Sequence, residues 1–177
     1  MEYVYAYPDR QLHLFGTVTG KRAFAIDARS GYLDAGLVPM LAGPLALVHG
    51  NGMLTAIDLR AGGKRWESAA GGQPAVANGV GYAIVSHYDV LEARAVATGL
   101  PEWQYQLPIV RQERRYGQAL ATSNLVFASS ETATVAVDLA TRQVVWVYPL
   151  GGHLALSEQG VLYIASANGR VVAINLR

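Results

Sequence analysis

The residues best suited to chemistry lie in two segments near the middle of the chain. Segment 108–118 contains three arginines, and its predicted contact residues are Arg111, Arg114, Arg115 and Tyr116. A guanidinium group can grip a carboxylate or phosphate through two parallel hydrogen bonds, and a tyrosine ring can flank such a ligand. The second segment is His87-Tyr88-Asp89. We predict that these seven residues bind a partner.

Catalytic motifs are missing from the sequence. It contains no Gly-x-Ser-x-Gly elbow, no phosphate-binding loop, no His-Glu-x-x-His and no calcium-loop spacing of carboxylates. Nothing in the spacing of Asp89 and Glu131 pairs them for acid–base work. His49, His87 and His153 fall in separate units, where they are interpreted as turn residues, with a shared metal as the alternative. We therefore predict neither a metal site nor a catalytic residue.

Composition narrows the class of protein. The chain has 177 residues, 51% of them hydrophobic and 15% charged, with a net charge of +1 and no cysteine. These values indicate a folded protein without disulfides, and they provide no field that would attract nucleic acid. The weakly polar stretch 36–48 is too short to span a bilayer, and the N-terminus lacks the basic start of a secretory signal. We expect no membrane insertion, and a cytoplasmic location by default or a periplasmic one if the chain is a fragment.

An internal repeat dominates the sequence. Five similar segments can be aligned on positions 27, 58, 95, 138 and 175, at intervals of 31, 37, 43 and 37 residues. Alanine stands two residues before this position in every copy. All three tryptophans, Trp66, Trp103 and Trp146, follow the position by eight residues. A repeat of this period indicates a solenoid or a propeller.

The local pattern around each repeat position is that of two strands joined by a tight turn. Asp27, Asp58 and Asp138 would each end a strand and accept hydrogen bonds from the turn. Four residues after the repeat position, Gly31, Gly62 and Gly99 can supply a positive φ, whereas Arg142 is the exception. Short runs rich in β-branched and aromatic residues precede them, and no helical periodicity occurs. The chain is therefore predicted to be all-β, with short blades of four strands and some of three.

The run Ala-x-Asp-x-x-Thr-Gly-x-x-x-Trp resembles the tryptophan-docking repeat of pyrroloquinoline-quinone-like β-propellers. Its residues are carried by Ala56-Ile57-Asp58, Gly62 and Trp66, by Thr98-Gly99 and Trp103, and by Asp138 and Trp146. This family includes quinoprotein dehydrogenases, outer-membrane assembly lipoproteins and sensor domains. The resemblance implies a propeller in which each tryptophan packs between blades against the small alanine of a neighbouring unit. It also implies, as a weaker alternative, a quinone cofactor with calcium.

The predicted domain is a single propeller over residues 1–177. Its five units cover about residues 8–38, 39–70, 73–107, 116–150 and 153–177, the last completed by residues 2–7. In this arrangement Tyr3-Val4-Tyr5 adds the missing outer strand to the last blade and closes the ring of a monomer. The alternative is a piece of a larger propeller, or an oligomer.

Because successive strands alternate in direction, the turns after the second strand of a unit and the linkers between units share one face. The seven predicted contact residues fall there, and we also assign Lys21 to it. Loops carry function more often than the scaffold does. The leading hypothesis is a non-catalytic module that binds a protein or peptide through this face. The alternative is a small-molecule binder or a degenerate quinone-dependent dehydrogenase.

Overall fold

A computed structural model describes residues 3–6, 11–16, 18–27, 39–50, 52–85, 89–108 and 117–176. These residues form strands joined by turns. No helix long and apolar enough to cross a membrane occurs among them. The strands are β1 (Tyr3–Ala6), β2 (Gln11–Gly16), β3 (Arg22–Asp27), β4 (Met40–Ala42), β5 (Leu45–Gly50), β6 (Met53–Asp58), β7 (Gly63–Ala69), β8 (Ala75–Ala77), β9 (Val80–Val85), β10 (Val90–Ala95), β11 (Pro101–Gln106), β12 (Gln118–Ala121), β13 (Leu125–Ser129), β14 (Thr134–Asp138), β15 (Val144–Tyr148), β16 (His153–Leu156), β17 (Val161–Ala165) and β18 (Val171–Asn175).

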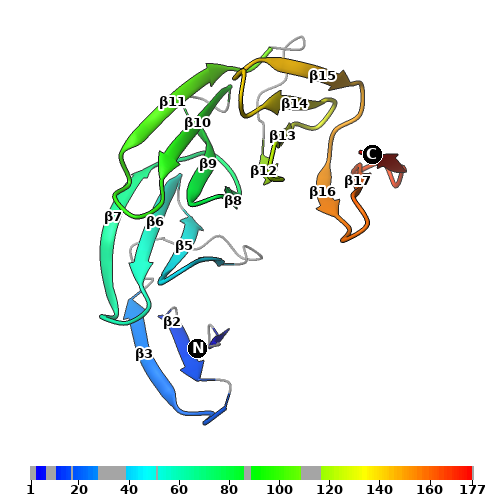
Figure 1. The fold of residues 1–177 in the computed structure, drawn as a ribbon. Helices are drawn as coiled ribbons and strands as arrows, with labels where there is room; N and C mark the ends of the chain where they lie inside the picture. The colour runs from blue at the N-terminus through cyan, green and yellow to red at the C-terminus, as the bar shows by residue number, and fades with distance from the viewer. Residues whose placement is uncertain are drawn as a thin grey trace.

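The described strands form five antiparallel sheets in chain order. The second, third and fourth sheets have four strands each, namely β4–β7, β8–β11 and β12–β15. The first sheet, β1–β3, and the last, β16–β18, have three. Figure 1 shows the sheets following one another along an arc, with the first and last at its two ends. The prediction of an all-β chain built from five repeats is confirmed.

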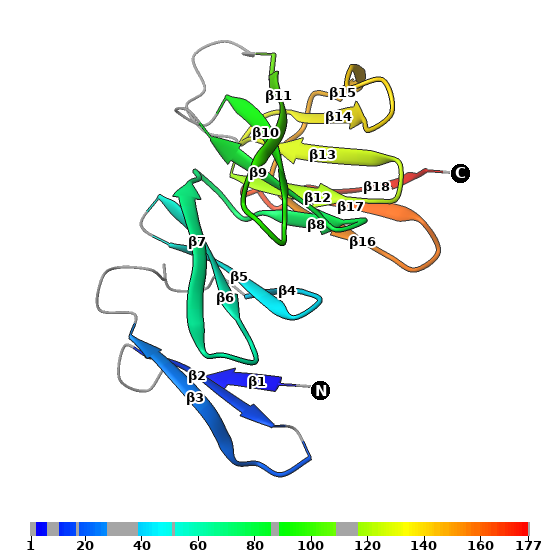
Figure 2. The same cartoon turned by 60° about the vertical axis from the view of Figure 1, so that its left-hand side comes forward.

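Strand register repeats from sheet to sheet. Ala56, Ala93 and Ala136 each face a tryptophan on the next strand, and a bulge follows each alanine. In the first sheet the same bulge follows Leu14, which faces Phe24. Figure 2 shows the outer strands β3, β7 and β11 succeeding one another. Strand β3 is therefore the counterpart of the tryptophan-bearing strands.

This register corrects the alignment of the first repeat. Asp27 ends the outer strand β3 and pairs with Gln11, so it does not occupy the turn position of Asp58 and Asp138. Gly16 takes that position. The sequence Phe24-Ala25-Ile26-Asp27 resembles the repeat motif in its residue types but lies on the outer strand. The hairpin turn of this sheet contains Gly20 with φ 63°, as the later turns contain Gly62 and Gly99.

The N-terminal strand also differs from its predicted role. Tyr3 to Ala6 pair with β2, residue by residue from Gly16 back to His13. The strand therefore builds the first sheet instead of completing the last one. Hairpin pairing with the next strand requires only a short connection, whereas pairing with β18 would require the ends of the arc to meet.

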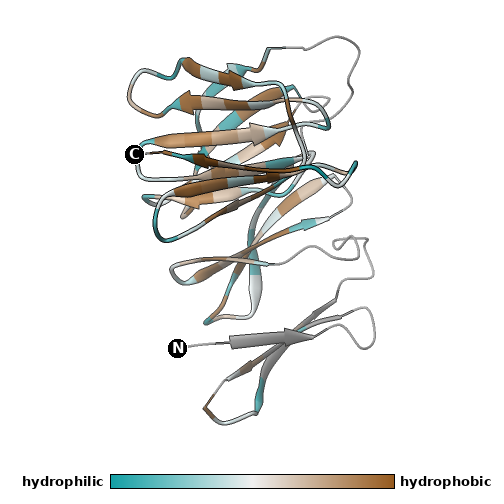
Figure 3. Cartoon of the chain, turned by 90° about the vertical axis from the view of Figure 1, so that its right-hand side faces the viewer, coloured by the Kyte–Doolittle hydropathy of each residue, from teal (hydrophilic) through white to brown (hydrophobic). Residues whose placement is uncertain are grey.

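The hydrophobic core lies between the sheets. Among the described residues, separate buried clusters fill the spaces between the second and third, third and fourth, and fourth and fifth sheets. Figure 3 shows apolar residues running along the stacked strands. The third and fourth sheets are thus covered on both faces, which explains why their inner strands read as nearly continuous apolar runs.

Candidate partner-binding face

Backbone hydrogen bonds sort the loops into two ends of the molecule. At one end, linkers between sheets bond to the turn after each second strand: Ala70 N donates to Gly52 O at 2.9 Å, and Leu107 N to Asp89 O at 2.8 Å. We call this end the loop face. At the other end, Leu59 N donates to Pro44 O at 2.9 Å and Leu139 N to Asn124 O at 2.9 Å. The predicted separation of the loops is therefore present. Lys21 belongs to the second end, because it lies in the β2–β3 turn.

Of the seven predicted contact residues, Asp89 is the one within the described part of the chain. His87, Tyr88, Arg111, Arg114, Arg115 and Tyr116 lie outside the described residues. Asp89 is partly exposed, and its carbonyl accepts hydrogen bonds from Leu107 N and, at 3.2 Å, from the Gln106 side chain. Asp89 therefore stands directly beside the start of the arginine-bearing segment.

The other end of that segment returns to the same face. Gly117 N donates to the carbonyl of Ser129 at 2.9 Å, next to the turn that presents Glu131. Two described residues that flank the arginines are thus held by different sheets, Leu107 by the third and Gly117 by the fourth. The structure brings the bases of the predicted loops together on one face.

Side-chain hydrogen bonds stiffen this face. The Thr134 hydroxyl donates to the Leu150 carbonyl at 2.8 Å, and the Ser129 hydroxyl accepts from Gly152 N at 3.0 Å. His49 fills the same role in the second sheet, where its Nε2–H donates to the Ala70 carbonyl at 2.9 Å. A carbonyl oxygen can only accept, so this contact requires the proton on Nε2. These residues hold the linkers in place, which is a structural role.

The linkers pack tightly enough to require glycine. A Cβ on Gly72 would overlap the Gly117 carbonyl, and one on Gly151 would overlap that of Ser130. The Gln118 side chain then pairs with the backbone of Leu154 in the next sheet, accepting at 2.8 Å and donating at 3.1 Å. The loop face consequently rests on a closely packed base.

Metal or quinone binding receives no positive support from the described residues. Among them, no three His, Asp or Glu side chains gather where a metal ion could be held. His153 is exposed on β16, and His87 lies outside the described residues. A calcium ion takes six to eight oxygen ligands, usually including carboxylates. The described residues do not gather such a donor set.

The turns at the opposite end show the predicted aspartate chemistry. One carboxylate oxygen of Asp58 accepts from the amides of Arg60 and Ala61, at 2.8 and 2.9 Å. Asp138 accepts from the amide of Thr141 at 2.7 Å, from its hydroxyl and from the Ala140 amide. These hydrogen bonds hold the pKa of both carboxyls below their usual value.

Trp66 and Trp103 dock onto turns of the following sheet. The Trp66 ring lies against Gly99, where a Cβ would come within 2.5 Å of the ring, and its Nε1–H donates to Val96 O at 2.7 Å. Trp103 instead lies under the guanidinium of Arg142, 6.0 Å from the ring centroid. Arg142 keeps the glycine-like φ of 59°. The neighbouring sheet thus contacts each of these two rings through a turn. The alanine opposite each ring belongs to the ring's own sheet and not, as expected, to a neighbouring unit.

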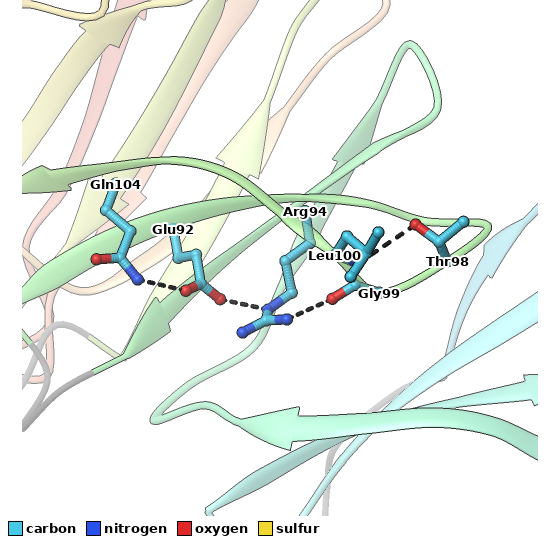
Figure 4. A network of polar contacts seen from close by, with 6 residues as sticks. All are labelled: Glu92, Arg94, Thr98, Gly99, Leu100 and Gln104. Atoms are coloured by element: carbon cyan, nitrogen blue, oxygen red, sulfur yellow. Dashed lines mark hydrogen bonds and ion pairs between the residues drawn. The ribbon is translucent and has the colours of Figure 1, made fainter.

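Sequence reasoning missed a buried polar network beside this contact. Glu92 is 3% exposed and forms an ion pair with Arg94, which also donates to the Gly99 carbonyl; Gln104 donates to the other oxygen of Glu92. Figure 4 shows the three side chains pointing to the same side of β10 and β11. The sequence does indicate that these charges lie together. In the alternating strand Leu91-Glu92-Ala93-Arg94, both charged side chains fall on the same face, the one toward the second sheet.

No family model matches the sequence, and no curated protein does. Among solved structures, BamB from Moraxella catarrhalis is 18% identical, with a TM-score of 0.74, over 98% of this chain and 54% of its own. A quinohemoprotein alcohol dehydrogenase from Pseudomonas putida HK5 is 16% identical, with a TM-score of 0.73, over 98% of this chain and 39% of its own. Hsv2p from Kluyveromyces lactis is 12% identical, with a TM-score of 0.75, over 99% of this chain and 58% of its own.

These likenesses establish the fold. The chain has a β-propeller fold, as the tryptophan repeat predicts. It spans about half the length of BamB and Hsv2p, and less of the dehydrogenase.

Proposed function

We propose that this propeller is a non-catalytic binding module whose loop face captures a protein or peptide bearing carboxylate groups. The observation that carries the proposal is the joint anchoring of the two predicted contact segments. Asp89 bonds to Leu107 at one end of the arginine-bearing segment, and Gly117 bonds to Ser129 at the other. The segment that carries the three arginines therefore follows a residue fixed to the third sheet and precedes a residue fixed to the fourth.

Charge and rigidity both favour this role. The chain as a whole carries a net charge of +1, so the three arginines of segment 109–116 form a local concentration of positive charge. Arginine prefers bidentate contact with carboxylates and is enriched at the energetic centres of protein interfaces. A base fixed by glycine packing and side-chain hydrogen bonds reduces the entropy lost when a partner is bound.

The test is selection of peptides from a random library, followed by fluorescence anisotropy with an acidic peptide so obtained. Reversing charge in Arg111→Glu, Arg114→Glu and Arg115→Glu together should weaken binding by at least about 100-fold, because attraction is replaced by repulsion at three sites. The matched control reverses three exposed cations at the opposite end, Lys21, Arg60 and Arg65, and should leave affinity within about threefold.

Two results would overturn the proposal. One is selection of peptides without acidic enrichment; the other is equal loss of affinity in the loop-face and control variants. Thermal melting of both variants ensures that affinities are compared between folded proteins.

A further inference from the structure

The third sheet presents a row of cross-strand residues to the sheet that follows it, and that sheet covers the row. In the third sheet the row runs across four strands as Ala75, Tyr82, Ala93 and Trp103. This row packs against Ala119, Ala128 and Val135 of the fourth sheet, together with Val126 and Val137. Tyr82 is 3% exposed there. The covering surface is thus a sheet of the same repeat, presenting small and β-branched side chains.

The last sheet repeats this row without a cover. Its cross-strand residues are Ala155, Tyr163 and Ala173, the same types in the same order. Tyr163 is 40% exposed, and Val171, the counterpart of the fully buried Leu91, is 63% exposed. Both alanines are exposed as well. No described strand pairs with the far edge of β18. We call this surface the open face.

We propose that the open face binds a second copy of this chain, so that two arcs join end to end around a twofold axis. The row Ala155-Tyr163-Ala173 requires the kind of cover that Ala75-Tyr82-Ala93 receives, namely a propeller sheet. Figure 1 places the open face at one end of the arc and the sheet β1–β3 at the other. In a twofold pair, each open face meets the outer side of the first sheet of its partner.

The size of known propellers of this type supports two copies. The chain aligns with 54% of BamB and 58% of Hsv2p, so two copies hold about as many residues as one of those proteins. A net charge of +1 per chain adds little repulsion between copies. A twofold pair uses the open face of each copy once, which favours a closed dimer over a filament.

Dimerisation and peptide binding would use different surfaces, because the open face is a sheet surface at the end of the arc and the loop face lies at the strand ends. Failure of peptide binding would leave this proposal intact, and a monomeric protein would leave peptide binding intact.

Sedimentation equilibrium of the full 177-residue chain, from about 1 to 100 μM, provides the test. A species of twice 18.9 kDa is expected. Val171→Lys places a charge in the contact and should raise the dimer dissociation constant at least about 30-fold. Val145→Lys is the matched control, because Val145 is also a strand valine, 58% exposed, and should change that constant by less than about twofold.

A monomer throughout the concentration range, an open series of larger oligomers, or a dimer equally sensitive to both substitutions would overturn the proposal. Tyr163→Ala provides a second probe that introduces no charge, and it should raise the dissociation constant about tenfold. Circular dichroism confirms that each variant retains its β-structure, so that loss of the dimer reflects the open face and not unfolding.

Discussion

The third and the last sheets carry the same cross-strand row and give it opposite surroundings. Ala75-Tyr82-Ala93 is buried under the fourth sheet, whereas Ala155-Tyr163-Ala173 faces outward. The residue types are the same, so exposure is decided by the next sheet and not by the row itself. A propeller sheet therefore has an apolar face that is buried only when the next sheet packs against it.

A second difference lies at the outer strand. Tyr82 contacts Trp103, with ring centroids 6.0 Å apart, and the Trp103 ring lies under Arg142 of the fourth sheet. Among the described residues, no outer strand brings a tryptophan to Tyr163. The aromatic contact within a sheet and the docking contact between sheets therefore depend on the same strand.

The largest expected effect tests the two tyrosines directly. Tyr82→Ala should lower the free energy of unfolding by about 3–5 kcal/mol, because it empties a packed core position. Tyr163→Ala in dilute, monomeric protein should lower it by less than about 1 kcal/mol. Urea denaturation of both variants measures the difference. Equal losses would show that the two faces are similarly buried in solution.

The buried ion pair on the other face of the third sheet gives the next effect. Glu92→Ala leaves Arg94 partly buried without its carboxylate and should cost about 3 kcal/mol in the free energy of unfolding. Glu102→Ala, at an exposed position on the adjacent strand, is the control and should cost less than about 0.5 kcal/mol. A Glu92 variant as stable as the control would refute the role of the network.

Docked and undocked turns can be compared through two glycines. Gly99 and Gly20 occupy equivalent turns with φ of 73° and 63°, but only a Cβ on Gly99 would strike Trp66, since nothing lies within 4 Å at Gly20. Both alanine variants incur backbone strain, and Gly99→Ala should cost about 1–3 kcal/mol more. Thermal unfolding measures this difference. Equal destabilisation would mean that the tryptophan does not dock on the turn.

The smallest effect concerns the turn aspartates. The lowered pKa of Asp138 means that its contribution to stability is complete above the unfolded value of about 3.9 and is lost as pH falls through the lower folded pKa. Asp138→Asn should therefore flatten the acid limb of the stability curve. The last sheet has Asn175 at the repeat position that Asp138 occupies in the fourth, and an asparagine side chain does not titrate. Urea midpoints between pH 2 and 6 test this, and an unchanged acid limb would contradict it.

Local patterns predicted the strands, the two-ended sorting of loops and the aspartate turns, because each depends on a few neighbouring residues. The predictions that failed concern which strands pair and in which register, and residue types alone do not determine these. Asp27 matched the repeat motif, yet the register of Leu14 with Phe24 places it on an outer strand. Tyr3-Val4-Tyr5 resembles an outer strand in sequence, but it pairs with β2, the next strand along the chain. The alternation Leu91-Glu92-Ala93-Arg94 predicts that both charges share one face of the strand, but the burial of Glu92 on that face depends on how the sheets pack.

The central claim is that the open face of the last sheet is covered by a second copy in solution. Hydrogen–deuterium exchange at low and high protein concentration tests it at the strands concerned. Amides of β17 and β18 should become more slowly exchanging as concentration rises, whereas those of β9 and β10, already covered within the chain, should not change. Exchange of β17 and β18 that is independent of concentration would contradict the account.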